Sequence, residues 1–401
     1  MLGTTVIRTE RIHLKPSGTL SRLCRHSKNL YNEANYIVRQ NLLKTGKWVR
    51  YNELAGMLKD SENYKALPAQ TAQQTLRVLD RSWKSFFRAV KEWKRHPEKY
   101  FNRPKIPGYK EKNGEFLLVF TNQQCRIIDR EIRFPERVGL RVVTRLGEEK
   151  VDLREVRIVP IGVGYALEVV YHKIVETVRL DESRIAGIDL GLRNIATIVN
   201  NIGEKPIAVK GGVVKSINQY YNRERARLQS IYDRQGIRAD SKLRRLTEKR
   251  NRKINDMFHK LSREIVDWCV KHYVGVIVLG HNRNWKQNSN LGRRNNQNFV
   301  QIPFNKLISQ IQYKAGEVGI TVIEQEEDHT SKCSFLDGEP VQHFDKYAGN
   351  RTSRGLFRSS KGIIINADVN AAYNIVRKAF PDAFADGIEG VGLHPVRMDL
   401  F

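Results

Sequence analysis

The chain has 401 residues, of which 40% are hydrophobic and 9% aromatic, so it can bury sizeable cores and is not intrinsically disordered. Its 70 Lys and Arg against 43 Asp and Glu give a net charge of +27, which favours a polyanionic partner; the absence of a long apolar run favours nucleic acid over a membrane. The four scattered cysteines and an N-terminus with no signal-peptide pattern indicate a reduced, cytoplasmic protein, which we expect to be nucleoid-associated.

The N-terminal part predicts one strand followed by helices. Residues 4–14 alternate apolar and polar side chains, as a half-buried strand does, and helical spacing of apolar residues follows at 20–43 and 51–60. A further helix after Pro68 has one apolar face and one basic face. We expect the basic face to contact nucleic-acid phosphates, although such a face can also be simply solvated; the candidates are Arg77, Arg81, Lys84 and Arg88.

Residues 97–113 are rich in Pro, Gly, Lys and Asn, which is typical of a linker. Aromatic and basic residues alternate there, as in grooves that follow a single strand, and the candidate contacts are Tyr100, Arg103, Lys105 and Tyr109. The strands predicted next indicate a small β-barrel or sandwich, into which residues 4–14 could pair: 115–120, 126–134, 138–145 and 155–171.

From residue 184 the pattern becomes α/β. Strands are predicted at 184–190, 194–200, 205–211, 274–280 and 319–326, with helices near 217–231, 243–268, 304–318 and 365–380. This is the element order of the RNase H fold. A dense basic run in the second helix is expected to bind phosphates through Arg244, Arg245, Lys249, Arg250 and Arg252. A polar segment at 283–299 could line a nucleic-acid site through Trp285 and Lys286, or be an exposed connection.

Two aspartates stand where a charge is costly. Asp189 ends an apolar strand just before the turn at Gly191, and Asp368 begins the last helix beside its apolar face. Hydrolysis of a phosphodiester can use two Mg²⁺ ions held by carboxylates that converge from different elements. We therefore expect both aspartates in a magnesium site; the alternative for Asp368 is a charge that only favours the helix dipole.

Four strings in this order resemble the TnpB family: GIDLGLRN with Asp189, RNWKQ at 283–287, TSKCS at 330–334 and NADVNAAYNI with Asp368. TnpB proteins are transposon-encoded nucleases related to type V CRISPR effectors, and their catalytic domain is a RuvC domain of the RNase H fold. The resemblance covers most of residues 184–380. It implies an RNA-guided, Mg²⁺-dependent DNA endonuclease that binds a guide RNA from the transposon end and double-stranded target DNA beside a short adjacent motif. It would act as a monomer or a dimer on one RNA.

The resemblance implies a multi-domain chain of α+β and α/β classes. A wedge-type β-barrel domain would combine residues 1–14 and 97–180, and a helical recognition domain would occupy residues 15–96. An RNase H-fold RuvC domain would span residues 181–401, with a degenerate zinc-ribbon insertion at about 331–363.

The chain departs from the family pattern at two places. The strand that usually ends in a catalytic glutamate ends here in Gly280, so the carboxylate must come from elsewhere or the nuclease is inactive. Some TnpB relatives, including the Fanzor proteins, have a relocated glutamate three residues before the TS string, which is Glu327 here, with Glu326 as the alternative. Neighbouring strands lie about 4.8 Å apart, a gap that a glutamate side chain partly bridges. Asp189, Glu327 and Asp368 would then ligate Mg²⁺; a solvated strand end is the alternative for these glutamates.

The second departure concerns zinc. The family usually has a four-cysteine ribbon, but only Cys333 remains here, so we expect no zinc site. Two other functions stay open: an RNA-guided DNA-binding protein without cleavage, acting as a repressor or targeting module, and a transposase-type or guide-independent nuclease.

Overall fold

The computed structural model describes residues 3–147, 151–176, 178–236, 241–281, 302–353, 355–385 and 392–398. The chain divides into two units, an N-terminal unit (Thr5–Ile174) and a C-terminal unit (Val175–Phe401 together with Met1–Thr4). The predicted separation of a helical domain from a β-barrel domain lies within the N-terminal unit and stays a prediction.

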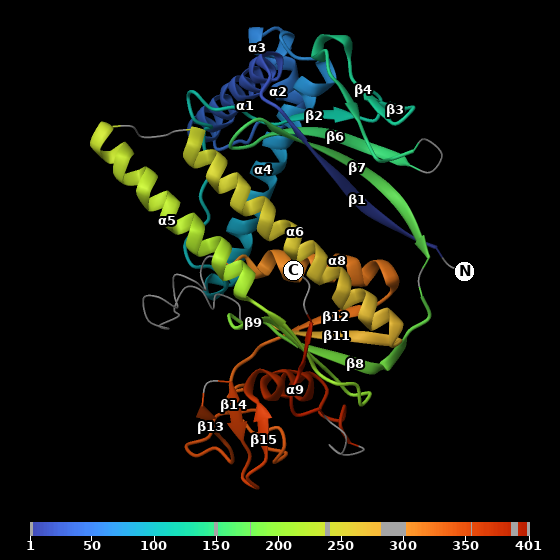
Figure 1. Ribbon diagram of the computed structural model, residues 1–401. Helices are drawn as coiled ribbons and strands as arrows, with labels where there is room; N and C mark the ends of the chain where they lie inside the picture. Colours follow the sequence, from blue (N-terminus) through green and yellow to red (C-terminus); the bar gives the residue numbers. More distant parts are fainter. Residues whose placement is uncertain are drawn as a thin grey trace. The chain divides into compact units, whose positions relative to one another are not determined.

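Two sheets form the β part of the N-terminal unit. The larger has the order β1-β7-β6-β2, with bounds Gly3–Leu14, Tyr165–Glu176, Asp152–Pro160 and Leu118–Thr121. The smaller has the order β3-β4-β5, with bounds Arg126–Ile128, Glu131–Arg133 and Arg141–Val143. The expected pairing of the first strand with the later ones is therefore confirmed, and the helices are inserted between β1 and β2 (Figure 1).

Two predicted single strands were wrong, because each is a hairpin. The segment 126–134 turns at Asp129 and Arg130, whose φ values are 50° and 62°, and 155–171 turns near Gly164 at φ 90°. Left-handed residues reverse the chain in a tight turn, and Asp tolerates that conformation better than most side chains do. The apolar periodicity continues on both sides of each turn, so it does not mark the reversal.

The helices of this unit are α1 (Gly18–Thr45), α2 (Tyr51–Leu58), α3 (Glu62–Lys65) and α4 (Ala69–Arg95), with 3-10 turns at Pro97–Lys99 and Glu136–Val138. Ser17 caps α1 by accepting a hydrogen bond from the Leu20 amide at 3.4 Å. Residues of α1, α4 and the larger sheet form one hydrophobic core, with Trp83 fully buried in it. The helices and the sheet therefore stabilise each other.

Residues 97–113 are not a free linker. Asn32 on α1 donates to the carbonyl of Lys110 at 2.9 Å and accepts from its amide at 2.8 Å, and Lys28 donates to the carbonyl of Lys112 at 2.7 Å. These side chains replace the regular backbone partners that a proline-rich segment lacks. The segment is therefore held along α1.

The C-terminal unit is built on a six-stranded sheet with the order β12-β11-β8-β9-β10-β16. Its strands run Thr321–Gln325, Val274–Gly280, Asp181–Asp189, Asn194–Asn200, Ile207–Lys210 and Val396–Met398. The β12, β11 and β8 strands are parallel, whereas β9 is antiparallel to both β8 and β10. The first five strands were predicted; β16 was not, because only three residues pair.

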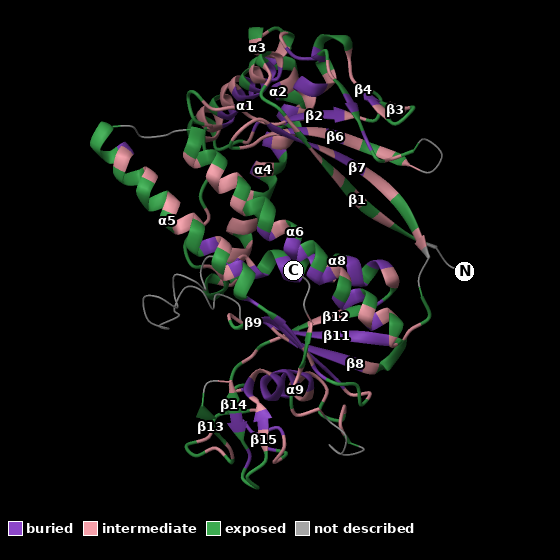
Figure 2. Cartoon of the chain, viewed as in Figure 1, coloured by how far each residue is buried: buried purple, intermediate pink, exposed green. Residues whose placement is uncertain are grey.

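Helices cover both faces of this sheet (Figure 1). One face packs on α6 (Ser241–Lys271) and α8 (Phe304–Val318), and the other on α9 (Ala367–Ala379). Because the sheet is covered on both sides, β11 is apolar throughout instead of alternating, and β8 is apolar and buried from Ile185 to Ile188; Figure 2 shows β11 buried along its length. A further helix, α5 (Gly212–Gln235), packs on α6 and is largely exposed.

A small sheet of β13 (Asn350–Ser353), β14 (Leu356–Arg358) and β15 (Ile364–Asn366) precedes α9 directly. Across the described residues, no helix has the length and apolarity that crossing a bilayer requires.

Candidate functional site

Asp189 lies at the end of β8, in the middle of the six-stranded sheet, opposite Thr197 on β9. The strand approaches α9 closely at Gly187. A Cβ built on Gly187 would lie 2.9 Å from the carbonyl oxygen of Ala372, nearer than real Cβ atoms approach backbone. The glycine therefore lets α9 pack against β8, which brings the first turn of α9 beside Asp189.

Asp368 is in that first turn of α9. Asn366 caps the helix by accepting from the amides of Asp368 at 3.0 Å and Val369 at 3.1 Å. The Asp368 carboxylate accepts a hydrogen bond from the side-chain amide of Asn194 at 2.8 Å. Because Asn194 begins β9, the turn after Asp189 fixes the orientation of the second aspartate.

Glu327 follows β12, the strand beside β11. The register aligns Gly280 with Gln325, so Glu327 lies two residues beyond the last paired residue. A Cβ built on Gly280 would collide with Oε1 of Glu327, would lie 3.0 Å from its Cγ, and would lie 2.5 Å from Cδ1 of Ile375. The Glu327 side chain thus occupies the space that any larger residue at position 280 would take.

The neighbouring acidic residues are arranged differently. Glu324 accepts hydrogen bonds from Gln312 at 2.8 Å and pairs with His281 at 2.9 Å, so it is engaged at the outer side of β12. Glu326 and Asp328 are exposed, whereas Glu327 is partly buried. Of the acids in this string, Glu327 is therefore the one turned toward Gly280; its catalytic role stays a prediction.

Ionisation of Asp189 and Glu327 is disfavoured at this end of the sheet. Burial raises the pKa of Asp189 well above its usual range, and the negative charges of Glu327 and Asp368 raise it further, whereas Arg351 on β13 lowers it. Burial, followed by the charge of Asp328, raises the pKa of Glu327 to about 7. Close carboxylates in a poorly solvated place disfavour ionisation, and a bound cation removes that penalty.

The donor set fits a hard divalent cation in its chemistry, because Asp189, Glu327 and Asp368 offer carboxylate oxygens, which Mg²⁺ prefers. Among the residues that the structure describes, no three His, Cys, Asp or Glu side chains already lie at the mutual distances of a metal cage. The acids converge from β8, the end of β12 and α9, and rotations of their side chains would have to bring the oxygens to ligand distance.

The segment after Glu327 is held by α9. Thr330 donates its hydroxyl to the Glu327 carbonyl at 2.8 Å. Asn370 and Asn374, both fully buried, donate to the Cys333 carbonyl at 2.9 and 2.7 Å, and Asn374 also donates to the Thr330 carbonyl at 2.9 Å. The TSKCS and NADVNAAYN strings thus fix the chain that begins at Glu327. Two asparagines spaced by four residues on the apolar face of α9 are the sequence signal for these contacts.

The predicted ribbon region is held by carboxylate and guanidinium groups. Glu339 accepts from the amides of Ser334 at 2.6 Å and Ala348 at 2.8 Å, and Arg377 on α9 donates to the Glu339 carbonyl at 2.6 Å. Cys333 is buried with a free thiol, which donates to the Gln342 carbonyl at 3.4 Å. These bonds close the turns that a ribbon would otherwise close through metal ligands.

A cavity of about 450 Å³ lies beside Asn194, the hydrogen-bond partner of Asp368. Asn194, which binds Asp368, lines it together with three cations, Arg193, Lys210 and Arg397. Lys210 pairs with Asn194 at the end of β10, so the sheet itself places a positive charge near Asp368. A phosphate group would find opposite charge here without displacing the acids.

The predicted nucleic-acid contacts lie at separate places. Arg77 stacks over Tyr51 at 4.1 Å, Lys84 pairs with Asp80 at 2.8 Å, and Arg103 lies 5.8 Å from the ring of Trp93. Two further candidates, Tyr100 and Arg250, are partly buried. The remaining described candidates are exposed: Arg81, Arg88, Lys105, Tyr109, Arg244, Arg245, Lys249 and Arg252. Trp285 and Lys286 lie outside the described residues. Binding by all of these residues stays a prediction.

Known proteins match this chain in sequence and in fold. Residues 168–286 match the family model OrfB_IS605, described as a probable transposase, and residues 304–375 match the Cas12f1-like TNB domain. The chain is 27% identical over 418 residues to the TnpB-like protein ORF457 of Acidianus two-tailed virus, across 93% of this chain and 86% of the viral protein.

A second relative is the CRISPR-associated endodeoxyribonuclease Cas12f2 of Micrarchaeota archaeon (strain CG1_02_47_40), 27% identical over 228 residues, or 54% of this chain and 40% of that protein. The cryo-EM structure of the Cas12f1-sgRNA-target DNA complex superposes with a TM-score of 0.55 at 16% identity, covering 88% of this chain and 81% of that one. At that identity the likeness is one of fold, a mixed α+β architecture of several sheets.

The two matched segments contain all three acids, with Asp189 in the first and Glu327 and Asp368 in the second. The chain therefore resembles the OrfB_IS605 family over residues 168–286 and the Cas12f1-like TNB domain over residues 304–375, and it is similar to a TnpB-like protein over most of its length.

Proposed function

We propose that the protein is an RNA-guided DNA endonuclease that cuts guide-matched DNA next to a short adjacent motif, in one RuvC-type site. The observation that carries the proposal is the position of Glu327, which fills the space beside Gly280 and raises the pKa of Asp189 together with Asp368. If the chain were a nuclease inactivated by a glycine at position 280, there would be no reason for the Glu327 carboxylate to occupy the space beside Gly280.

Asp189, Glu327 and Asp368 would hold Mg²⁺, which when bound lowers the pKa of water and neutralises charge on the phosphate. The chain contributes the orientation of these acids. Asn194 fixes the Asp368 carboxylate, and the α9 clamp on residues 330–333 fixes the backbone that leads from Glu327. Lys210, in the adjoining cavity, is placed to hold the phosphate of the strand being cut.

A guide RNA and double-stranded target DNA are the proposed partners. The net charge of +27 and the exposed basic residues of α4 and α6 support a polyanionic partner, and the relatives include CRISPR-associated endodeoxyribonucleases. In this arrangement base pairing with the guide reads the target sequence, and the protein binds the backbone. We place the protein in the cytoplasm, on the nucleoid.

A second candidate function is guided DNA binding without cleavage. Gly280 favours it, because the strand end that usually supplies a carboxylate supplies none. The absence of a preformed metal cage among the described residues is also compatible with it.

Purification of the full chain with its copurifying RNA, sequencing of that RNA and incubation with matched plasmid and Mg²⁺ separates the two functions. Cleavage by the wild type that is lost in Asp189→Asn supports the nuclease. Tight, guide-dependent binding with no cut in the wild type refutes cleavage and leaves guided binding. A cut that does not depend on the RNA sequence refutes guidance.

A further inference from the structure

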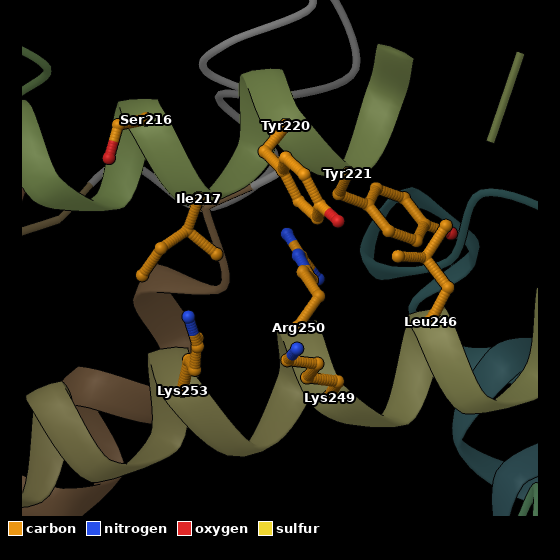
Figure 3. Close-up of a pocket in the computed structure, with 8 residues that line it drawn as sticks. All are labelled: Ser216, Ile217, Tyr220, Tyr221, Leu246, Lys249, Arg250 and Lys253. Carbon is orange, nitrogen blue, oxygen red and sulfur yellow. The ribbon is translucent and has the colours of Figure 1, made fainter. Parts of the chain in front are cut away.

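A cavity between α5 and α6 has two tyrosines on one side and three cations on the other. It measures about 150 Å³ and is lined by Tyr220 and Tyr221 of α5 and by Lys249, Arg250 and Lys253 of α6, with apolar contacts from Ile217 and Leu246. Figure 3 shows the Tyr220 ring and the Arg250 guanidinium reaching toward each other from opposite helices. Aromatic walls with nearby cations suit a ring attached to a phosphate.

The volume of the cavity limits the size of the ligand that it can bind. An engineered apolar cavity of about 150 Å³ in another protein holds benzene, so this space takes one six-membered ring. The surrounding cations would be unfavourable neighbours for an apolar ring with no charge attached. A pyrimidine base with its phosphate satisfies both the apolar walls and the positive side.

The polar side of the cavity is built by side chains held in place. Arg250 donates to Oδ1 of Asn218 at 2.9 Å and to Oδ1 of Asn251 at 2.9 Å, and its guanidinium lies 5.7 Å from the Tyr221 ring. Asn218 is almost fully buried, and its Nδ2 has no hydrogen-bond partner within the described chain. Asn218 does not itself line the cavity, so its part is to hold the Arg250 side chain that does.

Tyr220 differs from Tyr221 in its freedom to stack. Tyr220 is 49% exposed, with the Arg223 guanidinium 5.7 Å from its ring, whereas the Tyr221 hydroxyl is hydrogen-bonded to Thr247 at 3.2 Å. Burial lowers the pKa of Arg250, as expected for a cation partly removed from water. A nucleotide phosphate would compensate this loss of hydration.

We propose that the α5–α6 cavity binds a single unpaired pyrimidine nucleotide, with its base against Tyr220 and its phosphate near Lys249 and Lys253. The proposal rests on the proposed function in so far as it assumes a nucleic-acid partner, and it deepens that function. It assigns to these helices the binding of one extruded base, in addition to contact with the backbone.

The test compares the affinity of the full chain for RNA hairpins with one bulged cytidine or one abasic residue at the same place. Copurified nucleic acid is removed in high salt, and binding is measured in EDTA by fluorescence polarisation. Stacking of one base predicts that the wild type favours the cytidine by roughly 5- to 100-fold, and that Tyr220→Leu loses this preference. Deoxyribose hairpins tested in parallel identify whether RNA or DNA supplies the nucleotide; a preference for the base in either supports the proposal.

Two control variants outside the cavity show whether the effects are specific to it. Tyr313 on α8 is 40% exposed and does not line the cavity, so Tyr313→Leu should keep the preference for cytidine. Lys260 is on α6 and paired with Asp256 at 2.8 Å, so Lys260→Met should weaken binding of the bulged cytidine less than Lys253→Met does. Melting curves verify that each variant is folded.

Equal affinity of the wild type for the cytidine and abasic hairpins overturns the proposal. So does an equal loss of the preference for cytidine in Tyr220→Leu and Tyr313→Leu. These binding measurements involve no cleavage. A protein that binds the extruded base but does not cut DNA would contradict only the nuclease, and a protein that cuts DNA without discriminating the bulges would contradict only the cavity.

Discussion

Replacement of Gly280 by alanine adds one methyl group where the Glu327 side chain lies. The new Cβ would lie 3.0 Å from Cγ of Glu327 and 2.5 Å from Cδ1 of Ile375, besides colliding with Oε1 of Glu327. Gly280 ends a fully buried strand, and Ile375 belongs to the core beneath α9. The glutamate is the more flexible neighbour, so we expect its carboxylate to move away from Asp189.

The expected magnitudes follow from overpacking and from misplacement. Inserting a methyl group into a packed site typically costs about 1–3 kcal/mol of unfolding free energy. For a unit of this size, each kcal/mol lowers Tm by about 2–4 °C. If Glu327 acts in catalysis, displacing its carboxylate by about 1 Å lowers the cleavage rate by roughly 100-fold, far more than the change in folded fraction would.

Single-turnover cleavage of guide-matched DNA and thermal melting measure the two effects in Gly280→Ala. Gly316→Ala on α8 is the matched control, because a Cβ there meets no atom within 4 Å. It should keep the wild-type rate. In a Glu327→Ala background the destabilisation by Gly280→Ala should shrink, since one colliding partner is gone. A Gly280→Ala protein with wild-type rate and wild-type Tm would refute the packing of Glu327 against Gly280.

Three further predictions concern charge and hydrogen bonding. In EDTA, the raised pKa of Glu327, about 7 against its usual 4.5, means that the folded chain binds this proton more tightly. Protonation of Glu327 therefore adds about 3 kcal/mol to the free energy of unfolding, fully below about pH 4.5, and this stabilisation is lost as pH rises through about 7. The Tm of the wild type should fall between pH 5 and pH 8, and the Tm of Glu327→Gln should fall less. Asn194→Ala removes the donor to Asp368, and we expect a cleavage rate about 10-fold lower with little change in Tm; an unchanged rate would dismiss this orienting role. Glu339→Ala leaves the amide of the buried Ser334 without its carboxylate partner and removes the bond to the Ala348 amide, so Tm should drop by several degrees, while a zinc chelator should not alter the wild-type Tm; a chelator-sensitive Tm would contradict a ribbon held without metal.

Much of the C-terminal unit could be predicted from its sequence, because covered strands and amphipathic helices leave strong periodicities. The apolar run at 274–280 and the helix at 365–380 are examples, and both appear with nearly the expected bounds. The sheet neighbours follow from the parallel order, so the end of β12 could be expected beside Gly280. The sequence does not reveal that the Glu327 side chain, and not that of Glu326, turns toward Gly280, because this depends on the turn after Gln325.

The N-terminal unit was harder to predict for two physical reasons. Hairpin turns at Asp129 and Arg130 use left-handed residues within a continuous apolar pattern, so periodicity alone joined two strands into one. Residues 97–113 have a linker's composition, yet Asn32 and Lys28 on α1 bind their backbone. Side-chain contacts between segments more than 70 residues apart leave no local signal.

The most direct test of the account compares Glu327→Gln with Glu326→Gln in cleavage of guide-matched plasmid with Mg²⁺. Both substitutions remove one carboxylate from the same turn, and guide-dependent DNA binding serves as the control for folding. We predict that Glu327→Gln binds its target but cuts at least 100-fold more slowly, while Glu326→Gln cuts at nearly the wild-type rate. Normal cutting by Glu327→Gln would contradict the claim that Glu327 completes the site begun by Asp189 and Asp368.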